Sequence, residues 1–123
     1  MLAFLAHPGA TSAQERACGS SDPINTAKEM FSAIYACWEP PPGTAGMSIT
    51  LQFSLRRQGT LIGRPRATYS KLGGDEALNR AFVASILKAL DKALPLPLTD
   101  GMGGAIAGRI LAQRFTATSG GGA

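Results

Sequence analysis

The segment of residues 47–69, MSITLQFSLRRQGTLIGRPRATY, constrains the fold more than any other part of the chain. Apolar and polar residues alternate from Met47 to Leu55, and a period of two is typical of a strand with one buried and one exposed face. Gly59 suits the left-handed position of a three-residue loop with a bulge, which turns the chain back on itself. The segment therefore predicts an antiparallel β-hairpin.

The length of the loop decides the register of this hairpin. A two-residue loop at Gln58 and Gly59 would set Phe53 opposite Arg64 and mix the buried face with the exposed one. The three-residue loop makes every pair on the buried face apolar or small, so we expect that register. The pairs that it predicts are Leu55 with Leu61, Phe53 with Gly63, Leu51 with Pro65, Ile49 with Ala67 and Met47 with Tyr69.

Two helices are predicted, one on each side of the hairpin. The first runs from about Pro23 to Cys37 behind an Asp22 cap, and its apolar residues recur every three or four positions. The second begins at the cap Asp75 and shows a wide apolar face, which includes Leu87, before a proline ends it. Both helices therefore have one face that is suited to packing on a sheet.

A third strand is predicted over residues 105–115, AIAGRILAQRF, and we interpret the glycine-rich stretch at 101–104 as flexibility ahead of it. The order α-β-β-α-β predicts a two-layer α+β domain, with a three-stranded antiparallel sheet and two helices packed on one face. At 123 residues the chain fits a single domain. We place this domain at residues 22–116, between a leader at 1–21 and a flexible tail at 117–123.

Pro65 predicts where the third strand joins the sheet. In the expected register its pair with Leu51 is not hydrogen-bonded, so its missing N–H lies on the outer side of the second strand. A proline in that place is typical of an edge strand. The third strand then pairs with the first, in the order 2-1-3, and its own free edge is the predicted binding surface.

The N-terminal residues and the cysteines suggest export. Residues 1–6 are apolar and residues 11–13 resemble a signal-peptidase site, so we expect cleavage after Ala13 and a periplasmic location; an ordinary N-terminus is the alternative. Cys18 and Cys37 suit an oxidising compartment. Whether they are bridged stays open, because a helix from Pro23 to Cys37 is about 20 Å long and the chain from Cys18 must double back along it. The alternative is a buried, free Cys37 and a loose Cys18.

Catalytic and metal sites find little support in the sequence. The only histidine, His7, lies in the expected leader, so the domain cannot assemble a Ser-His-Asp or Cys-His set. A helix cap and first turn explain Asp75 and Glu76. The two cysteines and the remote histidine have no recognisable ligand spacing. We therefore expect no enzyme, no metal and no cofactor.

The arginines of the hairpin are its strongest chemical feature. The chain has a formal net charge of +4, and no acidic residue lies among these arginines. They are Arg56 and Arg57 at the turn, and Arg64 and Arg66 on the exposed face, opposite Gln52 and Thr50. A solvated face explains them, and an anionic partner is the alternative. We expect no aromatic residue on that face, and therefore no nucleic-acid binding.

The order and spacing of these elements resemble the C-terminal domain of the TonB/TolA family of periplasmic proteins, over about residues 24–115. The resemblance lies in the sequence CWEPP at 37–41, the strand SITLQFSL at 48–55, the Gly-Arg-Pro at 63–65, Ala81 and Phe82 in the second helix, the Pro-Leu-Pro at 95–97 and a last strand that ends at Phe115. The sequence departs from the family where Leu94 stands in place of a common cysteine, and in showing no membrane anchor or long spacer.

The resemblance implies a non-catalytic periplasmic module that adds a partner's strand to its own last strand. The partner would be a segment of an envelope protein, either an outer-membrane transporter or a Tol-type protein. The predicted partner-binding residues are Ala105, Ile106, Ala107, Arg109, Ile110, Leu111, Gln113 and Phe115. The alternative is a basic adaptor that binds an anionic envelope partner through the hairpin arginines. We expect a monomer or weak dimer, and no apolar run reaches the ~20 residues that span a bilayer.

Overall fold

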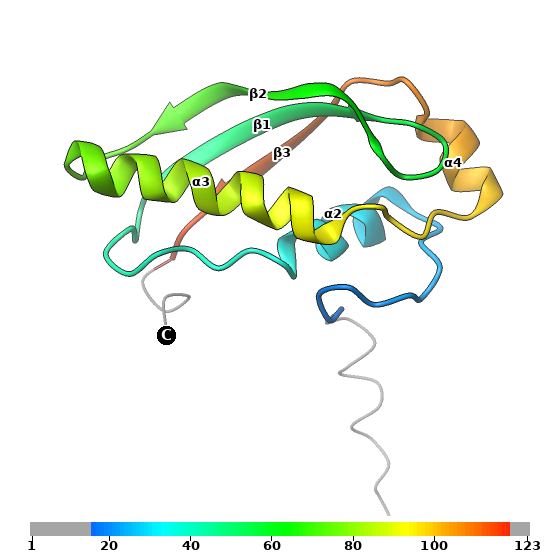
Figure 1. Ribbon diagram of the computed structural model, residues 1–123, viewed down its shortest axis with the longest axis horizontal. Helices are drawn as coiled ribbons and strands as arrows, with labels where there is room; N and C mark the ends of the chain where they lie inside the picture. Colours follow the sequence, from blue (N-terminus) through cyan, green and yellow to red (C-terminus); the bar gives the residue numbers. More distant parts are fainter. Residues whose placement is uncertain (1–15, 119–123) are drawn as a thin grey trace, which may run out of the picture.

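The computed structural model describes residues 16–118 and shows a three-stranded sheet with helices on one face (Figure 1). In chain order the elements are α2 (Ala27–Tyr35), β1 (Ser48–Leu55), β2 (Leu61–Lys71), α3 (Glu76–Ala93), α4 (Asp100–Ile106) and β3 (Leu111–Thr116). The strands are antiparallel and lie in the order β2-β1-β3. The predicted α+β class and strand order are confirmed, whereas α4 is an additional helix.

The core lies between the sheet and helices α2 and α3. The row Phe82, Ile86 and Leu90 of α3 is almost fully buried, with at most 1% of each side chain exposed. It packs with the apolar residues of β1, which alternate along the strand, and with Met30 and Ile34 of α2. Burial of each side chain of this size contributes roughly 1.5–3 kcal/mol, so this layer interface holds the fold together.

An aromatic cluster closes the core at the end of α2. The indole ring of Trp38 lies edge-on to Phe82 and Phe115, with centroids 5.8 and 5.3 Å away. Its Nε1 donates a hydrogen bond of 2.9 Å to the hydroxyl of Ser85 in α3. Because Trp38 is only 9% exposed, this bond satisfies a polar group that would otherwise be buried alone.

Helix α2 begins later than predicted, and the expected cap at Asp22 is wrong. The N-cap is Thr26, whose hydroxyl accepts from the backbone N–H of Glu29 at 3.1 Å, while the Glu29 carboxylate accepts from the N–H of Thr26. This capping box satisfies two N–H groups that the helix leaves free. The residues before it are extended instead, because Ile24 forms a parallel bridge with Leu98.

Helix α3 begins and ends as predicted. The side chain of Asp75 accepts from the backbone N–H of Leu78 at 2.8 Å, and the helix ends at Ala93, just before the prolines. Its apolar face is narrower than expected, since Leu87 is 41% exposed. Leu87, one position beyond Ile86, therefore lies at the edge of the core rather than in its interior.

The predicted hairpin register is confirmed at the turn and wrong beyond it. Leu55 pairs with Leu61, the N–H of Arg56 donates to the carbonyl of Thr60, and Gly59 has a φ of +86°. Further along, Leu51 pairs with Ala67 rather than Pro65, Ile49 pairs with Ser70 rather than Ala67, and Tyr69 pairs with Thr50 rather than Met47. Two irregularities shift the register, one between Gln52 and Ser54 and one between Thr50 and Leu51.

The first irregularity explains why Leu51 does not pair with Pro65, and the second, a shift of one residue, turns Tyr69 to the opposite face of β2. Gly63 has a φ of +69°, a left-handed conformation that the uniform strand pattern does not anticipate. The residues that follow bulge out, so that Pro65 has no partner in β1. The conclusion drawn from Pro65 is correct, because β2 is an edge strand, but the Leu51 pair on which it rested does not exist.

The third strand begins later than predicted, because the first two of its expected residues belong to a helix and the next four to a connection. Residues 100–106 form α4, capped by the Thr99 hydroxyl, which accepts from the N–H of Met102 at 3.1 Å. The glycine-rich stretch is therefore not a flexible lead-in. A Cβ on Gly103 would lie 2.6 Å from the carbonyl oxygen of Arg57, so the glycine allows α4 to pack directly against the hairpin turn. Figure 1 shows α4 at this end of the sheet, with β3 following it.

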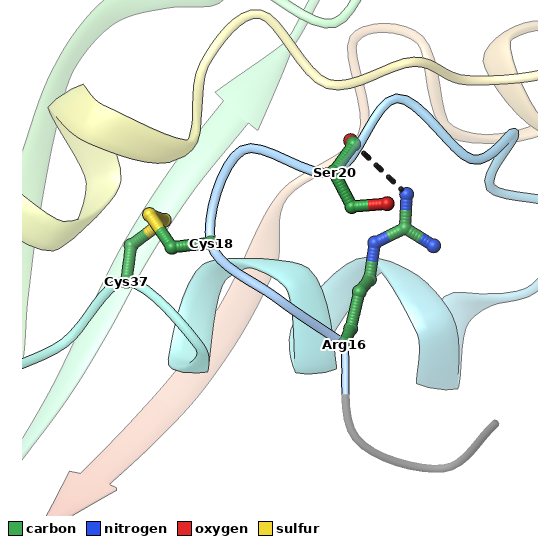
Figure 2. Close-up of a disulfide and its surroundings, with 4 residues drawn as sticks. All are labelled: Arg16, Cys18, Ser20 and Cys37. Atoms are coloured by element: carbon green, nitrogen blue, oxygen red, sulfur yellow. Dashed lines mark hydrogen bonds between the residues drawn. A yellow bond between two sulfur atoms is a disulfide. The ribbon is translucent and has the colours of Figure 1, made fainter. Parts of the chain in front are cut away.

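The two cysteines form a disulfide, which settles the pairing that the sequence left open (Figure 2). The Cα atoms of Cys18 and Cys37 are 4.7 Å apart. The expected geometric obstacle disappears because α2 is short, from residue 27 to residue 35, and Cys37 lies beyond its end. The guanidinium of Arg16 donates to the carbonyls of Ser20 and Asp22, which folds the segment before the helix into a compact loop.

Candidate functional site

Strand β3 has one edge that no other strand of residues 16–118 covers. The N–H of Ala117 donates to the carbonyl of Met47 at 3.0 Å, which fixes the phase of the ladder between β3 and β1. In an antiparallel ladder, residues alternate between bonding to the neighbour and pointing away from it. The backbone groups of Ala112, Arg114 and Thr116 therefore point away from β1, and all three residues are exposed.

The predicted binding residues do not form one strand. Ala105 and Ile106 belong to α4, and Ile106 is a core residue with 7% of its surface exposed. Ala107, Arg109 and Ile110 lie in the connection between α4 and β3. Only the last three predicted residues, which are Leu111, Gln113 and Phe115, lie in β3.

Within β3, sequence reasoning missed the residues that present the edge. Gln113 and Phe115 are buried, at 8% and 0% exposure, so their side chains face the helices. Ala112 and Arg114 carry the outward backbone groups and were not among the predicted residues. The alternation of LAQRFT over residues 111–116, with Phe115 apolar and Arg114 charged, is the signal that could have identified them.

Tyr35 occupies one end of the open edge of β3. Its hydroxyl donates to the carbonyl oxygen of Thr116 at 3.2 Å, and its ring stacks on Phe115 with centroids 5.7 Å apart. The side chain is 42% exposed, so it lies at the surface beside the strand. The carbonyl of Thr116 is therefore occupied, whereas the outward groups of Ala112 and Arg114 bond to nothing within residues 16–118.

The side chain of Gln113, on the buried face of β3, is hydrogen-bonded to α2. Its Nε2 donates to the carbonyl oxygen of Phe31 at 3.0 Å, across the layer interface. Its Oε1 is buried and has no hydrogen-bond partner in the described part of the chain. The bond to Phe31 fixes the orientation of the amide and joins β3 to the helix layer.

The outer face of the sheet, opposite the helices, carries a row of three side chains across all three strands. Arg114 of β3 donates through Nε to the hydroxyl of Thr50 in β1 at 3.1 Å. Its guanidinium carbon lies 4.4 Å from the ring centroid of Tyr69 in β2, a cation–π contact. The expectation that this face has no aromatic residue is wrong, because the register shifts bring Tyr69 onto it.

The four hairpin arginines do not form one cluster. Arg66 lies on the outer face as predicted, but it pairs with Gln52 rather than with Thr50. Arg64 lies in the bulge without a partner in β1, so its predicted place opposite Gln52 is wrong. At the turn, Arg56 donates to the carbonyl of Leu61 and Arg57 lies against the glycines of α4, so both support the turn.

Positive charge is nevertheless concentrated on the sheet layer. No Asp or Glu occurs at residues 40–74 or 101–123, and all eight acids lie elsewhere in the sequence. The only ion pair among residues 16–118 joins Arg80 to Glu76 on the helix layer. The cations of the sheet and its loops are thus without acidic partners. They are Arg56, Arg57, Arg64, Arg66, Lys71, Arg109 and Arg114.

The hollow beside the disulfide does not bring together a catalytic set of side chains from residues 16–118. It has a volume of about 300 Å³ and is lined by Ser85, Glu39 and two lysines of α3, among others. The Ser85 hydroxyl already donates to the carbonyl of Phe82 and accepts from Trp38. Within residues 16–118, no group of three His, Cys, Asp or Glu side chains could hold a metal ion. The one histidine, His7, lies outside the described residues, as does the expected cleavage site after Ala13.

The fold and this surface define a two-layer α+β domain with an open edge at β3 and a basic, uncovered sheet face. The chain belongs to the family of uncharacterised conserved proteins UCP034077, whose sequence model matches residues 20–119. No curated protein and no solved structure matches the chain. Among the helices of the described residues, none is long and apolar enough to cross a membrane.

Proposed function

We propose that the protein is a non-catalytic interaction module of the periplasm that binds an extended segment of an envelope protein as a fourth strand beside β3. The observation that carries this proposal is the outward backbone of Ala112 and Arg114, which is exposed and unpaired within the described residues. The resemblance to TonB/TolA C-terminal domains supports it, since those domains use their last strand in this way.

The open edge offers an added strand two residues whose backbone groups point outward. Ala112 and Arg114 each offer one N–H and one C=O, and each backbone hydrogen bond contributes about 0.5–1.5 kcal/mol net. A partner that pairs with both residues gains affinity from its backbone alone, while its side chains determine specificity. The scaffold behind this edge is rigid, because β3 is fixed to β1 by its ladder and to α2 through Gln113.

The disulfide supports the location. Structural disulfides persist in oxidising compartments such as the bacterial periplasm and are rare in the cytosol. The bond between Cys18 and Cys37 joins the segment before α2 to the start of the following loop. Cleavage after Ala13 would leave Cys18 in the mature chain, so export and this bond are compatible.

Two matched proline variants test the proposal. Ala112→Pro removes an N–H that points away from β1, so the β1–β3 ladder is retained while the outer edge loses a donor. Ala67→Pro makes the same change on the opposite edge of the sheet, where the N–H of Ala67 also points away from β1. Peptides selected on the wild-type protein from a random decapeptide display library are the probe.

We expect the selected peptides to bind Ala67→Pro as well as they bind the wild type. They should bind Ala112→Pro at least tenfold more weakly, because one or two backbone hydrogen bonds are lost. Near-ultraviolet circular dichroism of Trp38 verifies that both variants are folded. Equal binding to Ala112→Pro and wild type would exclude β3 as the binding strand. Loss of binding in Ala67→Pro alone would place the site on the β2 edge.

A second candidate is the basic adaptor, in which the outer sheet face binds an anionic envelope partner without strand pairing. The absence of acids from the whole sheet layer favours it. Binding of that kind weakens steeply with salt, because exposed charges are screened within about 3 Å at 1 M ionic strength. Backbone pairing at β3 depends little on salt, so a titration at two salt concentrations separates the two candidates.

A further inference from the structure

The charges around β3 indicate what kind of segment it pairs with, an inference that rests on strand addition at this edge. In an added strand, the side chain directly beside Arg114 lies with its Cβ atom about 4.5–5.5 Å from that of Arg114. It shares the outer face with Arg66 and Lys71, which are placed there by their pairs with Gln52 and Ser48. Every charged residue of the three strands is cationic.

Arg114 can form such a contact once its side chain turns toward the open edge. Its Nε now donates to the Thr50 hydroxyl and its guanidinium lies over Tyr69, so the side chain extends across β1 and away from that edge. Its two terminal nitrogens make no hydrogen bond with any residue from 16 to 118. A guanidinium in this state can donate two parallel bonds to one carboxylate, the pairing for which its planar geometry is suited.

Ile110 indicates that the partner is a peptide rather than a bare polyanion. It directly precedes β3 and is 73% exposed, the most exposed of the large apolar side chains in the described chain. A strand that extends along β3 by one more residue covers it. A polyphosphate or acidic polysaccharide has neither an apolar side chain for Ile110 nor a backbone that matches the spacing of the outward N–H and C=O groups.

We infer that the partner of β3 is an acidic extended peptide, which places a carboxylate beside Arg114 on the outer face of the sheet. The other sheet cations add attraction at longer range, which raises the rate of association more than it slows dissociation. A segment with lysine or arginine at the same positions meets an unbalanced positive face and is rejected.

Three ten-residue peptides test this inference. They alternate threonine with glutamate, with glutamine or with lysine, so that any two-residue shift of register presents the same side chain to Arg114. Binding is measured by fluorescence anisotropy in 50 mM and in 1 M NaCl. The protein is used as wild type, Arg114→Gln, Ala112→Pro and Lys88→Gln, the last removing an exposed cation from α3 as the control.

We expect the glutamate peptide to bind about tenfold more tightly than the glutamine peptide at low salt, because a few exposed pairs contribute ~0.5 kcal/mol each. Arg114→Gln should remove most of that difference and Lys88→Gln little of it, and 1 M NaCl should abolish it. The lysine peptide should show no measurable binding.

The binding measurements distinguish failure of the acidic-peptide inference from failure of strand addition. If the glutamate and glutamine peptides bind equally and Ala112→Pro weakens both, strand addition stands and the acidic partner is wrong. If the glutamate peptide binds Ala112→Pro as well as wild type, strand addition itself fails and the inference fails with it. Displacement of the glutamate peptide by sodium polyphosphate at matched charge, with the same salt dependence, would reassign the face to general anion binding.

Discussion

Gly59 lies at the contact between the hairpin turn and the segment after α3, and its replacement by alanine tests how the turn is held. A Cβ on Gly59 would lie 2.3 Å from the carbonyl oxygen of Leu96 and 2.7 Å from its nitrogen. The Leu96 N–H also donates to the Gly59 carbonyl at 3.1 Å. Gly59→Ala must therefore move Leu96 away and weaken this bond, in addition to placing alanine at a φ of +86°.

The energetic costs of Gly59→Ala add up to a large loss of unfolding free energy. The left-handed conformation costs alanine about 1 kcal/mol, the displaced backbone about 1–3 kcal/mol, and the hydrogen bond about 1 kcal/mol. Gly63→Ala is the matched control, because Gly63 has a φ of +69° but a Cβ there would meet nothing within 4 Å. We expect Gly59→Ala to lose ~4 kcal/mol of unfolding free energy and Gly63→Ala only ~1 kcal/mol.

Urea unfolding followed by the fluorescence of Trp38 measures both losses. With a slope of roughly 1–2 kcal/mol per molar urea, the midpoints should fall by about 3 M and by less than 1 M. Similar midpoints for the two variants would mean that backbone conformation alone explains both glycines. The proposed contact between the turn and Leu96 would then be refuted.

Three further predictions concern the disulfide, a carboxylate and the end of the β3 edge. Replacing both Cys18 and Cys37 by serine opens a loop of 19 residues and should cost about 3 kcal/mol in urea unfolding under oxidising conditions; an unchanged midpoint would contradict this. The backbone N–H of Asn25, with that of Thr26, lowers the pKa of Glu29 below its ordinary value of 4.5. Since the folded pKa is the lower one, the stabilisation is present above pH 4.5 and is lost as the pH falls through the folded value. Glu29→Gln should therefore flatten the acid limb of a curve of unfolding free energy against pH. An unaltered limb would refute the capping role of Glu29. Tyr35→Phe frees the Thr116 carbonyl and should tighten the binding of a strand that reaches it by a few-fold in anisotropy titrations, whereas weaker binding would mean that the hydroxyl contacts the partner.

The sequence predicts the order of elements because their signals are local. The alternation of β1, the cap at Asp75 and the left-handed glycine at the turn each depend on a few neighbouring residues, and each is confirmed. The strand order predicted from Pro65 is confirmed, although the pair with Leu51 on which that prediction rested does not exist. These signals are sufficient for a two-layer α+β domain with β3 at an edge.

The errors occur where contacts distant in sequence decide the conformation. Nothing local distinguishes the two irregularities of β2 from regular strand positions, yet the second, a one-residue shift between Ala67 and Tyr69, brings Tyr69 to the outer face. The glycines of α4 have poor helix propensity, and their helix forms because Gly103 packs on the Arg57 carbonyl and Thr99 caps the first turn. The pairing of the extended residues before α2 with Leu98 likewise depends on the assembled sheet and loops.

The candidate site shows the same contrast between local sequence signals and contacts that are distant in sequence. The sequence predicts that the edge of the last strand is the binding surface, but it includes five residues that lie in α4 or in the following loop. It misses Ala112 and Arg114, although the alternation of residues 111–116 carries their signal, and the pair of Ala117 with Met47 fixes the phase in the folded sheet. The contacts of Arg114 with Thr50 and Tyr69, two residues on other strands, depend on the register of the assembled sheet.

Amide hydrogen exchange of β3 is the most direct test of strand addition. The N–H groups of Ala112 and Arg114 point to solvent and should exchange quickly in the free protein, while the N–H of Gln113 is protected by β1. On saturation with a peptide selected for binding, we predict that exchange at Ala112 and Arg114 slows at least tenfold, with little change at Ala67 on the opposite edge. Unchanged exchange at Ala112 and Arg114 in the saturated complex would contradict the proposal that a partner strand pairs with β3.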